Sequence, residues 1–408
     1  MKDAAYLDRK EVHRNAKEAK EAGKESFKDA WVTDSTEEER ARGVTIDVGV
    51  RKIALKDKNI VFLDSPGHRD FIPNMITGAA QADYAILVVD VDNFEGSFEG
   101  GGQTKEHAYI VRSLGVHKLI VAINKMDRIE WGQERFALIH GRLSNYLAKI
   151  GFKEDQVLFI PTSAVQGLFL TPKHMRPFSF GPRKYTQSLL EIISDLPVPP
   201  RPIDKPFRMT ITNVYEPQFG RLKGHCIAGK VEGGVIEQHN KLVILPIDTQ
   251  CLVKDMVVND EKVKQAAVGD SVDIQIKLLE ETNFEIIKTG MVLSSLQYSV
   301  PVAQKVVVEA LALDLDLPVL RGTEVVVYVA TSRCPARITR INYIFNPSDG
   351  SIIKKNPKSI RSHDCAEIEL EFKEKMCVEL FSNYKVFGRV IIREKKETLF
   401  VGTIKKIK

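Results

Sequence analysis

Two short polar motifs in the first half of the sequence each follow an apolar run of strand length. The first, DSPGH at residues 64–68, comes directly after NIVFL at residues 59–63. It offers a carboxylate at the end of a strand in Asp64, a glycine N–H that can approach a phosphate closely in Gly67, and an imidazole in His68. These are the parts of a phosphoryl-transfer switch. Taken alone, the motif also fits a Pro-Gly turn with an incidental histidine.

The second motif, NKMD at residues 124–127, ends another apolar run and carries groups that can select guanine. The Asp127 carboxylate can accept two parallel hydrogen bonds from the N1–H and N2–H groups of guanine, worth about 1.5–3 kcal/mol each. Adenine presents no such donor pair. We expect Asn124 to tie this loop to the rest of the site and the aliphatic stem of Lys125 to cover the base plane. Two motifs in this order, each after a strand, favour a guanine-nucleotide site over a chance match.

Two weaker elements complete the set. The segment ERARGVTI at residues 39–46 precedes the DSPGH strand, and the hydroxyl of Thr45 within it is an oxygen ligand of the kind that Mg²⁺ accepts. Thr162, Ser163 and Ala164 follow the last apolar run, where backbone N–H groups can meet the guanine O6. Taken singly, neither element identifies a site.

The elements that must position these motifs are predicted to be a parallel sheet and its helices. Near-continuous apolar runs alternate with segments of helical pattern, such as residues 132–150 and the solvent-facing residues 8–30. The apolar runs of strand length are residues 59–63, 84–89, 118–123 and 157–160. Because ligands of such sheets bind beyond the carboxyl ends of the strands, the polar clusters at these ends should converge on one site.

A change of pattern follows at residues 196–206, where five prolines stand in eleven residues and indicate a linker. Beyond it, short β-branched runs broken by Gly, Asn and Asp indicate barrels or sandwiches. The predicted fold class is therefore α/β plus all-β, with an α/β domain over residues 1–200 and two β-barrel domains over residues 201–299 and 300–408.

Composition is that of an ordinary globular protein, with 28% charged and 43% apolar residues in 408. The net charge of +5 permits a polyanionic partner such as ribosomal RNA without demanding one. The five cysteines show no CxxC pairing, which favours reduced thiols and a cytosolic location over a disulfide framework or a zinc site. No stretch approaches the run of about 20 apolar residues that a membrane helix needs. The histidines His107 and His140 show no metal-ligand spacing and are predicted to be structural or surface residues.

Through these motifs the chain resembles the translational GTPase family of elongation factor one-alpha. The resemblance covers essentially the whole chain and rests on ERARGVTID, DSPGHRDFIPNMI, GGQTKEH, NKMD and PTSA in this order. Within that family, VDNFEGSFEGGGQTKEHAYIVRSLGV, NKMDRIEWGQERF, PARITRI and GRVIIRE most resemble the ribosome-rescue GTPases that partner Pelota, with the class II release factors next. The resemblance implies a P-loop-type GTPase domain followed by two β-barrels.

The resemblance also implies a role for each motif residue. Thr45 would sense the γ-phosphate and Mg²⁺, Asp64 would hold Mg²⁺ through water, and Gly67 would contact the γ-phosphate. His68 would position the attacking water, and Val44 matches the hydrophobic gate beside that histidine. GTP and Mg²⁺ are the implied cofactors, and hydrolysis would be slow until the ribosome helps to place the histidine.

The chain departs from the family pattern in one feature, and this feature determines its expected affinity for nucleotide. A phosphate-binding loop needs GxxxxGK[ST] between a strand and a helix, and no such motif stands in these 408 residues. The pair Gly23-Lys24 lies late in a helical pattern and lacks the other motif residues. Losing four charge-assisted phosphate contacts forfeits about 6 kcal/mol, or about four orders of magnitude in affinity. The first strand is expected to be missing with the loop, which exposes sheet edges.

Two explanations of this departure compete. Either the protein begins upstream of Met1, or the chain is a relative without the loop that binds partners without turnover; the retained catalytic set favours the first. The leading hypothesis is a monomeric, cytoplasmic GTP-hydrolysing factor that delivers a Pelota-like protein to a stalled ribosome. The alternatives are a non-enzymatic ribosome- or Pelota-binding scaffold and an elongation factor that carries aminoacyl-tRNA.

Overall fold

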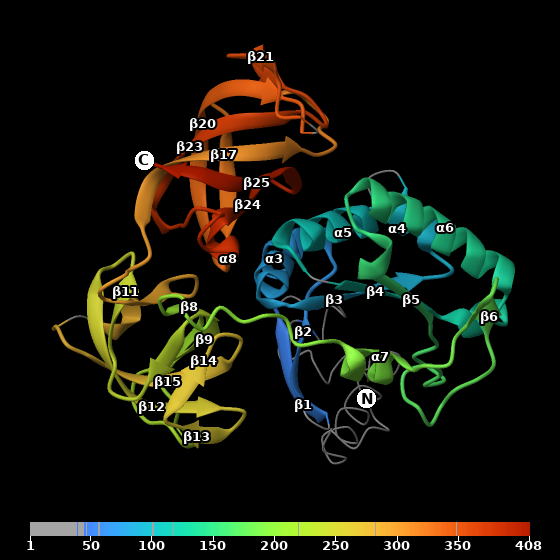
Figure 1. The fold of residues 1–408 in the computed structure, drawn as a ribbon, viewed down its shortest axis with the longest axis horizontal. Coiled ribbons are helices and arrows are strands. Elements are labelled where there is room, and N and C mark those ends of the chain that lie inside the picture. The colour runs from blue at the N-terminus through green and yellow to red at the C-terminus, as the bar shows by residue number, and fades with distance from the viewer. Residues whose placement is uncertain are drawn as a thin grey trace. The chain divides into compact units, whose positions relative to one another are not determined.

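The computed structural model describes most of the chain, in two compact units. The described residues are 39, 45 and 47–408, apart from 56–57, 100–101, 117, 219, 282 and 348. The units are Met1–Pro199 and Pro200–Lys408. Figure 1 shows helices together with strands in the first unit and mainly strands in the second. The helix expected over residues 8–30 lies outside the described residues, and so does Val44.

A parallel sheet lies at the centre of the first unit, with its strands in the order β3-β4-β5. The register places Asp90 opposite Asn124, so the carboxyl ends of β3 and β4 are level. β4 is the middle strand, and its central residues are all buried, which explains its continuous apolar run. The predicted strands are confirmed. Their bounds are Tyr84–Asp90 for β3, Lys118–Asn124 for β4 and Val157–Pro161 for β5.

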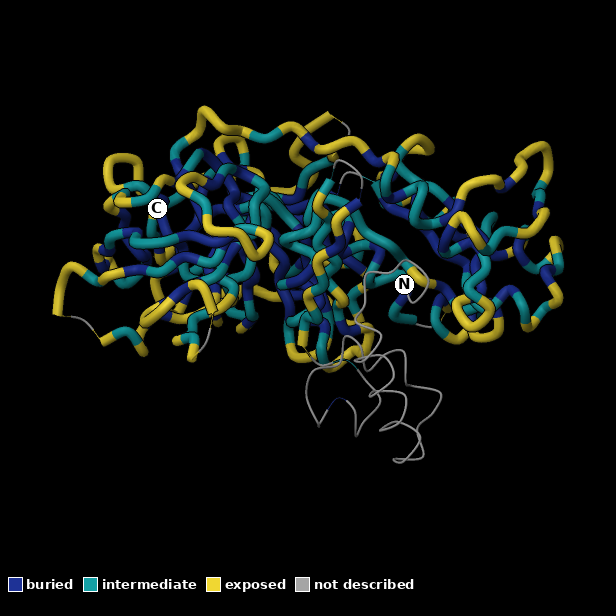
Figure 2. Tube along the Cα trace, turned by 90° about the horizontal axis from the view of Figure 1, so that it is seen from below, coloured by how far each residue is buried: buried dark blue, intermediate teal, exposed yellow. Residues whose placement is uncertain are grey.

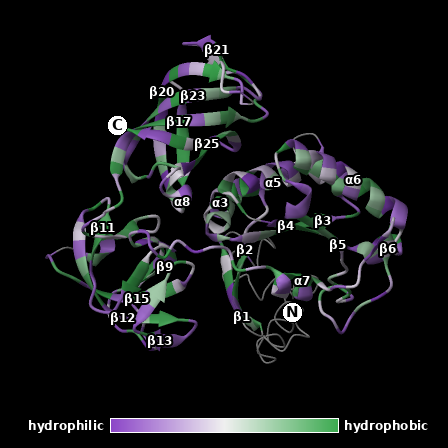
Figure 3. Cartoon of the chain, in the orientation of Figure 1, coloured by the Kyte–Doolittle hydropathy of each residue, from purple (hydrophilic) through white to green (hydrophobic). Residues whose placement is uncertain are grey.

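Amphipathic helices accompany this sheet. In α6 the apolar residues Phe136, Ile139, Leu143 and Leu147 are buried, as their spacing of three and four predicted. Figure 3 shows hydrophobic and hydrophilic residues interleaved along this helix. The α-helices described here are α3 (Ile72–Gln81), α4 (Phe94–Phe98), α5 (Gln103–Leu114), α6 (Gln133–Lys149) and α7 (Leu189–Asp195). The 3-10 turns are η4 (Arg69–Phe71), η5 (Met126–Ile129) and η6 (Glu154–Gln156).

A separate hairpin precedes the parallel sheet. β1 (Gly49–Leu55) and β2 (Lys58–Asp64) pair with each other in antiparallel fashion. Residues 59–63 were predicted to belong to the parallel sheet, and this prediction is wrong: they pair with β1 in antiparallel fashion, and among the described residues β2 does not pair with β3. Val88 of β3 is 62% exposed although the strand is apolar.

The second unit contains two closed rings of six antiparallel strands, and the predicted α/β plus all-β class is confirmed. In the first ring the order is β11-β16-β8-β9-β15-β12, closed by β11 on β12, with β13 beside β12. The strands are β8 (Arg208–Tyr215), β9 (Cys226–Gly233), β11 (Lys241–Leu245), β12 (Thr249–Val258), β13 (Glu261–Val263), β15 (Ser271–Leu278) and β16 (Val292–Ser295).

The second ring has the order β19-β24-β25-β17-β23-β20, closed by β19 on β20, with β21 beside β20. Its strands are β17 (Val302–Ala312), β19 (Glu324–Val329), β20 (Ser332–Phe345), β21 (Ile352–Lys355), β23 (Cys365–Cys377), β24 (Arg389–Glu394) and β25 (Glu397–Ile407). Shorter elements are β6 (Ser179–Phe180), β7 (Arg183–Lys184), β10 (Val235–Glu237), β14 (Gln265–Ala267), η7 (Phe284–Ile286), β18 (Val319–Leu320), β22 (Ser359–Ile360) and α8 (Lys385–Gly388).

Each ring encloses its own apolar core, because alternate residues of its strands point inward. In β15, for example, Val272, Ile274 and Ile276 are buried and the residues between them are half-buried. Figure 2 shows buried residues along the strands of this unit and exposed residues mainly in the loops. All five cysteines are free and buried, which agrees with the prediction of reduced thiols.

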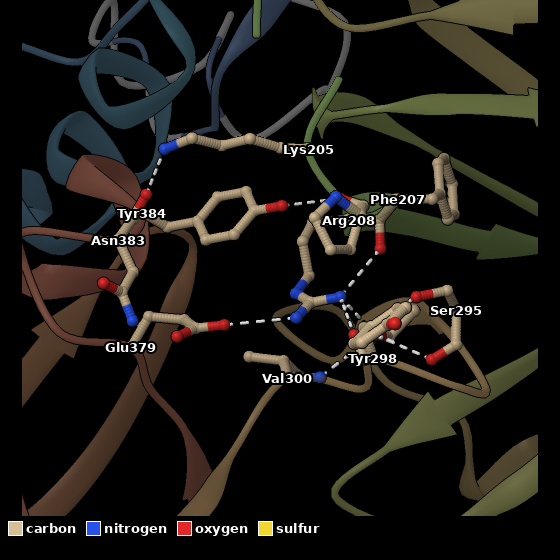
Figure 4. Close-up of polar contacts among 11 residues, drawn as sticks. Lys205, Phe207, Arg208, Ser295, Tyr298, Val300, Glu379, Asn383 and Tyr384 are labelled. Carbon is tan, nitrogen blue, oxygen red and sulfur yellow. Dashed lines mark hydrogen bonds and ion pairs between the residues drawn. The ribbon is translucent and has the colours of Figure 1, made fainter. Parts of the chain in front are cut away.

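A buried arginine lies where the two rings of the second unit meet. Arg208 of β8 is 3% exposed. Its guanidinium donates hydrogen bonds to the Ser294 hydroxyl at 3.0 Å, to the Tyr298 carbonyl, and to the Glu379 carboxylate at 3.2 Å. Figure 4 shows Arg208 between Tyr298 and Glu379, together with Tyr384, whose ring lies 5.2 Å from the guanidinium. Because Glu379 lies two residues beyond the end of β23, this ion pair links the first ring to the second.

Candidate functional site

The base-recognition motif lies in the loop that leaves β4. Asn124 is the last residue of that strand, and Met126 behind it is buried. Asp127 lies in the 3-10 turn η5, and its Oδ1 atom is buried. Among the described residues, no group donates a hydrogen bond to this oxygen. A buried carboxylate oxygen without a donor is costly, so this atom fits a ligand that brings its own N–H groups.

Asn124 joins this loop to the one after β5. Its Oδ1 accepts hydrogen bonds from the Ala164 N–H at 3.0 Å and from the Thr162 hydroxyl at 3.3 Å. The Met126 N–H donates to the Thr162 carbonyl at 3.1 Å. The Ser163 side chain is fully buried, and its hydroxyl accepts from the Gln166 N–H at 3.3 Å. The structure therefore brings the NKMD and TSA residues together beyond neighbouring strands, as the strand pattern predicted.

Two carboxylates that were not predicted as site residues lie beside the same loop. Asp90, the last residue of β3, pairs with Lys125 at 2.6 Å, and Asp92 pairs with Arg128 at 3.1 Å. Partial burial raises the pKa of Asp90, but hydrogen bonds from Lys125 and from backbone N–H groups outweigh it and lower that pKa on balance. The polar cluster DVDN at the strand end was the only sequence signal for these residues.

The DSPGH loop leaves the end of β2 on the separate hairpin. Asp64, Gly67 and His68 are exposed, whereas Pro66 is buried. The His68 ring accepts a hydrogen bond through Nδ1 from the Asp70 N–H at 3.2 Å, which places the ring at the start of η4. The loop therefore offers its carboxylate and imidazole to solvent.

His107 of α5 lies next to this loop. A Cβ atom placed on Gly67 would lie 3.8 Å from Cε1 of the His107 ring. The Nε2 atom of that ring is buried, and no hydrogen-bond partner for it occurs in the described part of the chain. Burial lowers the pKa of His107, which favours the neutral ring. The prediction that His107 is structural or a surface residue did not foresee this neighbour.

Of the remaining predicted residues, the structure describes Thr45 and Asp64 but not Val44. Thr45 is half-buried, and nearby Asp47 accepts a hydrogen bond from the Asn74 side chain at 3.1 Å. Thr45 and Asp64 were predicted to hold Mg²⁺, and their oxygen atoms suit that hard cation. No group of three or more His, Cys, Asp or Glu residues that could hold a metal occurs among the described residues. Val44, the predicted gate, lies outside them.

Comparison with known proteins assigns the chain to a family. The model of the elongation factor Tu GTP binding domain matches residues 7–199, and that of the GTP-eEF1A C-terminal domain matches residues 305–405. The chain is 36% identical over 410 residues to elongation factor 1-alpha of Desulfurococcus mucosus, covering 99% of this chain and 91% of that protein. The chain belongs to the family of elongation factor 1-alpha-like translational GTPases.

A second relative within this family is Protein HBS1 of Drosophila melanogaster, which is 37% identical over 408 residues. The match covers all of this chain but only 60% of the HBS1 protein, so the chain spans less than two thirds of that relative. Among solved structures, the GTPase-like domain of Ski7 from S. cerevisiae, bound to GTP, has a TM-score of 0.77 at 17% identity and covers 99% of this chain and 92% of its own. At that identity the likeness supports the fold alone.

Proposed function

We propose that this chain is a guanine-nucleotide-dependent translation factor that acts on the ribosome. The observation that carries the proposal is the buried Asp127 Oδ1 without a donor, held in a loop that Asn124 ties to Thr162 and Ala164. A guanine base would supply the missing N–H groups. The N–H groups of Thr162 and Ser163 already have carbonyl acceptors. For the TSA backbone to meet the guanine O6, the Ala164 N–H would therefore have to leave the Asn124 side chain. Within the family, the likeness to HBS1 over the whole chain supports the ribosome-rescue type, which would deliver a Pelota-like protein to a stalled ribosome.

The residues of the switch would share the work of hydrolysis. The exposed His68 would orient the attacking water and Gly67 would contact the γ-phosphate through its N–H, while Val44 would gate the histidine. Thr45 and Asp64 would hold Mg²⁺, which neutralises the charge that develops on the phosphate oxygens. Because His68 is hydrogen-bonded to its own turn and exposed, an outside contact would be needed to place it, which fits activation by the ribosome.

The proposed domain bounds, oligomeric state, location and partners are those predicted from the sequence. We assign the nucleotide domain to residues 1–200 and the two β-barrel domains to residues 201–299 and 300–408, and we propose a monomer that works in the cytoplasm. Ribosomal RNA and a Pelota-like protein are the proposed partners.

Two observations favour a second candidate function. The 408 residues contain no GxxxxGK[ST] motif, and no hydrogen bond among the described residues joins β2 to β3. Phosphate affinity of this chain should therefore be low. The second candidate is a ribosome- or Pelota-binding scaffold on the same fold that does not turn over nucleotide.

Binding of labelled GTP to the 408-residue chain separates these two functions. A dissociation constant of about 1 µM or tighter would exclude the scaffold and the argument from the absent phosphate loop together. GTP binding that is weaker than about 1 µM but is lost when Asp127 is replaced would support the guanine site.

Partner choice is tested separately by capture of purified partners on the immobilised chain. We expect a purified Pelota-like protein to be retained and aminoacyl-tRNA to pass through. Retention of aminoacyl-tRNA alone would instead identify an elongation factor.

A further inference from the structure

The base-binding loop, residues 124–131, has a backbone that its residue types do not favour. Lys125, Glu130 and Trp131 have φ angles of 65°, 50° and 62°. This left-handed region costs a residue with a side chain on the order of 1–2 kcal/mol. Such conformations persist only where surrounding contacts hold them. The contacts at each end of the loop therefore decide whether its base-facing atoms stay in place.

Aromatic packing holds the far end of the loop. Trp131 is 7% exposed, and its ring centroid lies 5.5 Å from that of Phe169 and 6.0 Å from that of Phe178. The Arg176 guanidinium lies 4.8 Å from the Trp131 ring centroid. Trp131 is therefore held by burial and by these ring contacts.

Ion pairs hold the near end. The Lys125 ammonium lies 2.6 Å from Asp90 Oδ2, with side-chain exposures of 45% and 30%. The other oxygen, Asp90 Oδ1, accepts the Asp92 N–H at 2.9 Å, so both oxygens of this carboxylate are bonded. The Arg128–Asp92 pair, at 3.1 Å, has exposures of 64% and 37% and is the weaker of the two.

The segment that carries Asp90 and Asp92 is held by α6 through Val91 and Glu95. Arg135 donates to the Val91 carbonyl from Nε at 3.0 Å and from Nη2 at 2.6 Å. The same guanidinium forms a bidentate pair with Glu95 at 2.6 and 2.7 Å. The Val91 N–H donates to the Asn124 carbonyl at 3.2 Å. The amphipathic helix α6 thus fixes the segment that carries Asp90, and Asp90 fixes Lys125.

We infer that Asp90 is a positioning residue for guanine recognition, which holds Lys125 so that its aliphatic stem lies over the base plane and Asp127 faces the base edge. The inference rests on the proposed guanine site. Asp90 does not touch the base in this arrangement. It acts through Lys125 and through the left-handed backbone at that residue.

Amide hydrogen exchange of the ligand-free full chain tests the inference without nucleotide. The amides of Met126, Arg128, Glu130 and Trp131 are hydrogen-bonded in the loop and report its opening. In Asp90→Ala their exchange should rise about three- to tenfold, the range for loss of a partly exposed charge pair. Asp90→Glu, which keeps the charge, should restore part of the protection.

Glu99→Ala is the matched control. Glu99 pairs with Arg142 of α6, and neither residue contacts the base loop in the described contacts. Amide hydrogen exchange of the base-binding loop in Glu99→Ala should equal that of the wild type. Unchanged loop exchange in Asp90→Ala would overturn the inference, and so would a rise that spreads equally through α6 or that Asp90→Glu does not reverse.

A second arm adds GTP to the same proteins. GTP should slow loop exchange in the wild type, and Asp90→Ala should need about fivefold more GTP for the same effect. If GTP protects no variant, the proposed function fails while the ligand-free exchange still decides the role of Asp90. If GTP protects wild type and Asp90→Ala at equal concentrations, the inference fails and the guanine site stands.

Discussion

Replacing Arg208 with alanine should destabilise the second unit strongly. The substitution removes a guanidinium that bonds to Ser294, Tyr298 and Glu379 where the two rings meet. It leaves the Glu379 carboxylate behind, which is 5% exposed and makes its described side-chain hydrogen bond to Arg208. A buried carboxylate without its cation is unfavourable because water cannot solvate it.

The size of the effect follows from this burial. Breaking a buried pair by removing one partner costs about 3–5 kcal/mol. With a urea dependence of about 2–3 kcal/mol/M for a unit of this size, the unfolding midpoint should fall by about 1–2.5 M. Replacing both partners with apolar residues, as Arg208→Met with Glu379→Leu, should recover most of the loss, because a buried pair is often no more stable than apolar packing.

Urea titration followed by two signals can locate the loss. Both tryptophans, Trp31 and Trp131, belong to residues 1–199, so their fluorescence reports the first unit, and far-ultraviolet circular dichroism reports the strands of the second as well. In Arg208→Ala we expect the dichroism transition to move and the fluorescence transition to stay. A loss below about 1 kcal/mol, or a double variant no more stable than the single one, would refute the reasoning.

Three further predictions concern stability. Leu143→Ala should cost about 2.7–5 kcal/mol, measured by tryptophan fluorescence in urea, because Leu143 is fully buried in α6. Gly402→Ala should cost about 1–3 kcal/mol by circular dichroism, since the added Cβ would lie 2.4 Å from the Glu309 carbonyl oxygen. Hydrogen bonds from Arg135 lower the pKa of Glu95 to about 2. This stabilisation is present above pH 4.5 and is lost as the pH falls towards 2, so Glu95→Gln should flatten the stability profile in that window.

Those features of the first unit that depend on local pattern were predictable from the sequence. The apolar runs located β3, β4 and β5, although only β4 is buried along its whole centre, as expected for the middle strand of a parallel sheet. The strand ends then predicted that Asn124 and Ala164 would meet, and they are 3.0 Å apart through the Asn124 side chain. The helical spacing of three and four likewise identified the buried face of α6.

Contacts between distant segments were not predictable in the same way. Many carboxylates in the sequence could have paired with Lys125, and Asp90 is its partner because the register of β3 and β4 sets the two strand ends side by side. The pair of Arg208 and Glu379 joins residues 171 positions apart, with no periodic pattern to reveal it. The position of His107 beside Gly67 similarly depends on how α5 packs.

The most direct test of the guanine site is calorimetric titration of the chain with GTP and with ATP, repeated on Asp127→Ala. Without a phosphate-loop motif, GTP should bind more weakly than about 1 µM. It should still bind at least about tenfold more tightly than ATP, and this preference should disappear in Asp127→Ala, because the preference depends on one carboxylate. Equal affinity for GTP and ATP, or a GTP preference that survives in Asp127→Ala, would contradict the assignment.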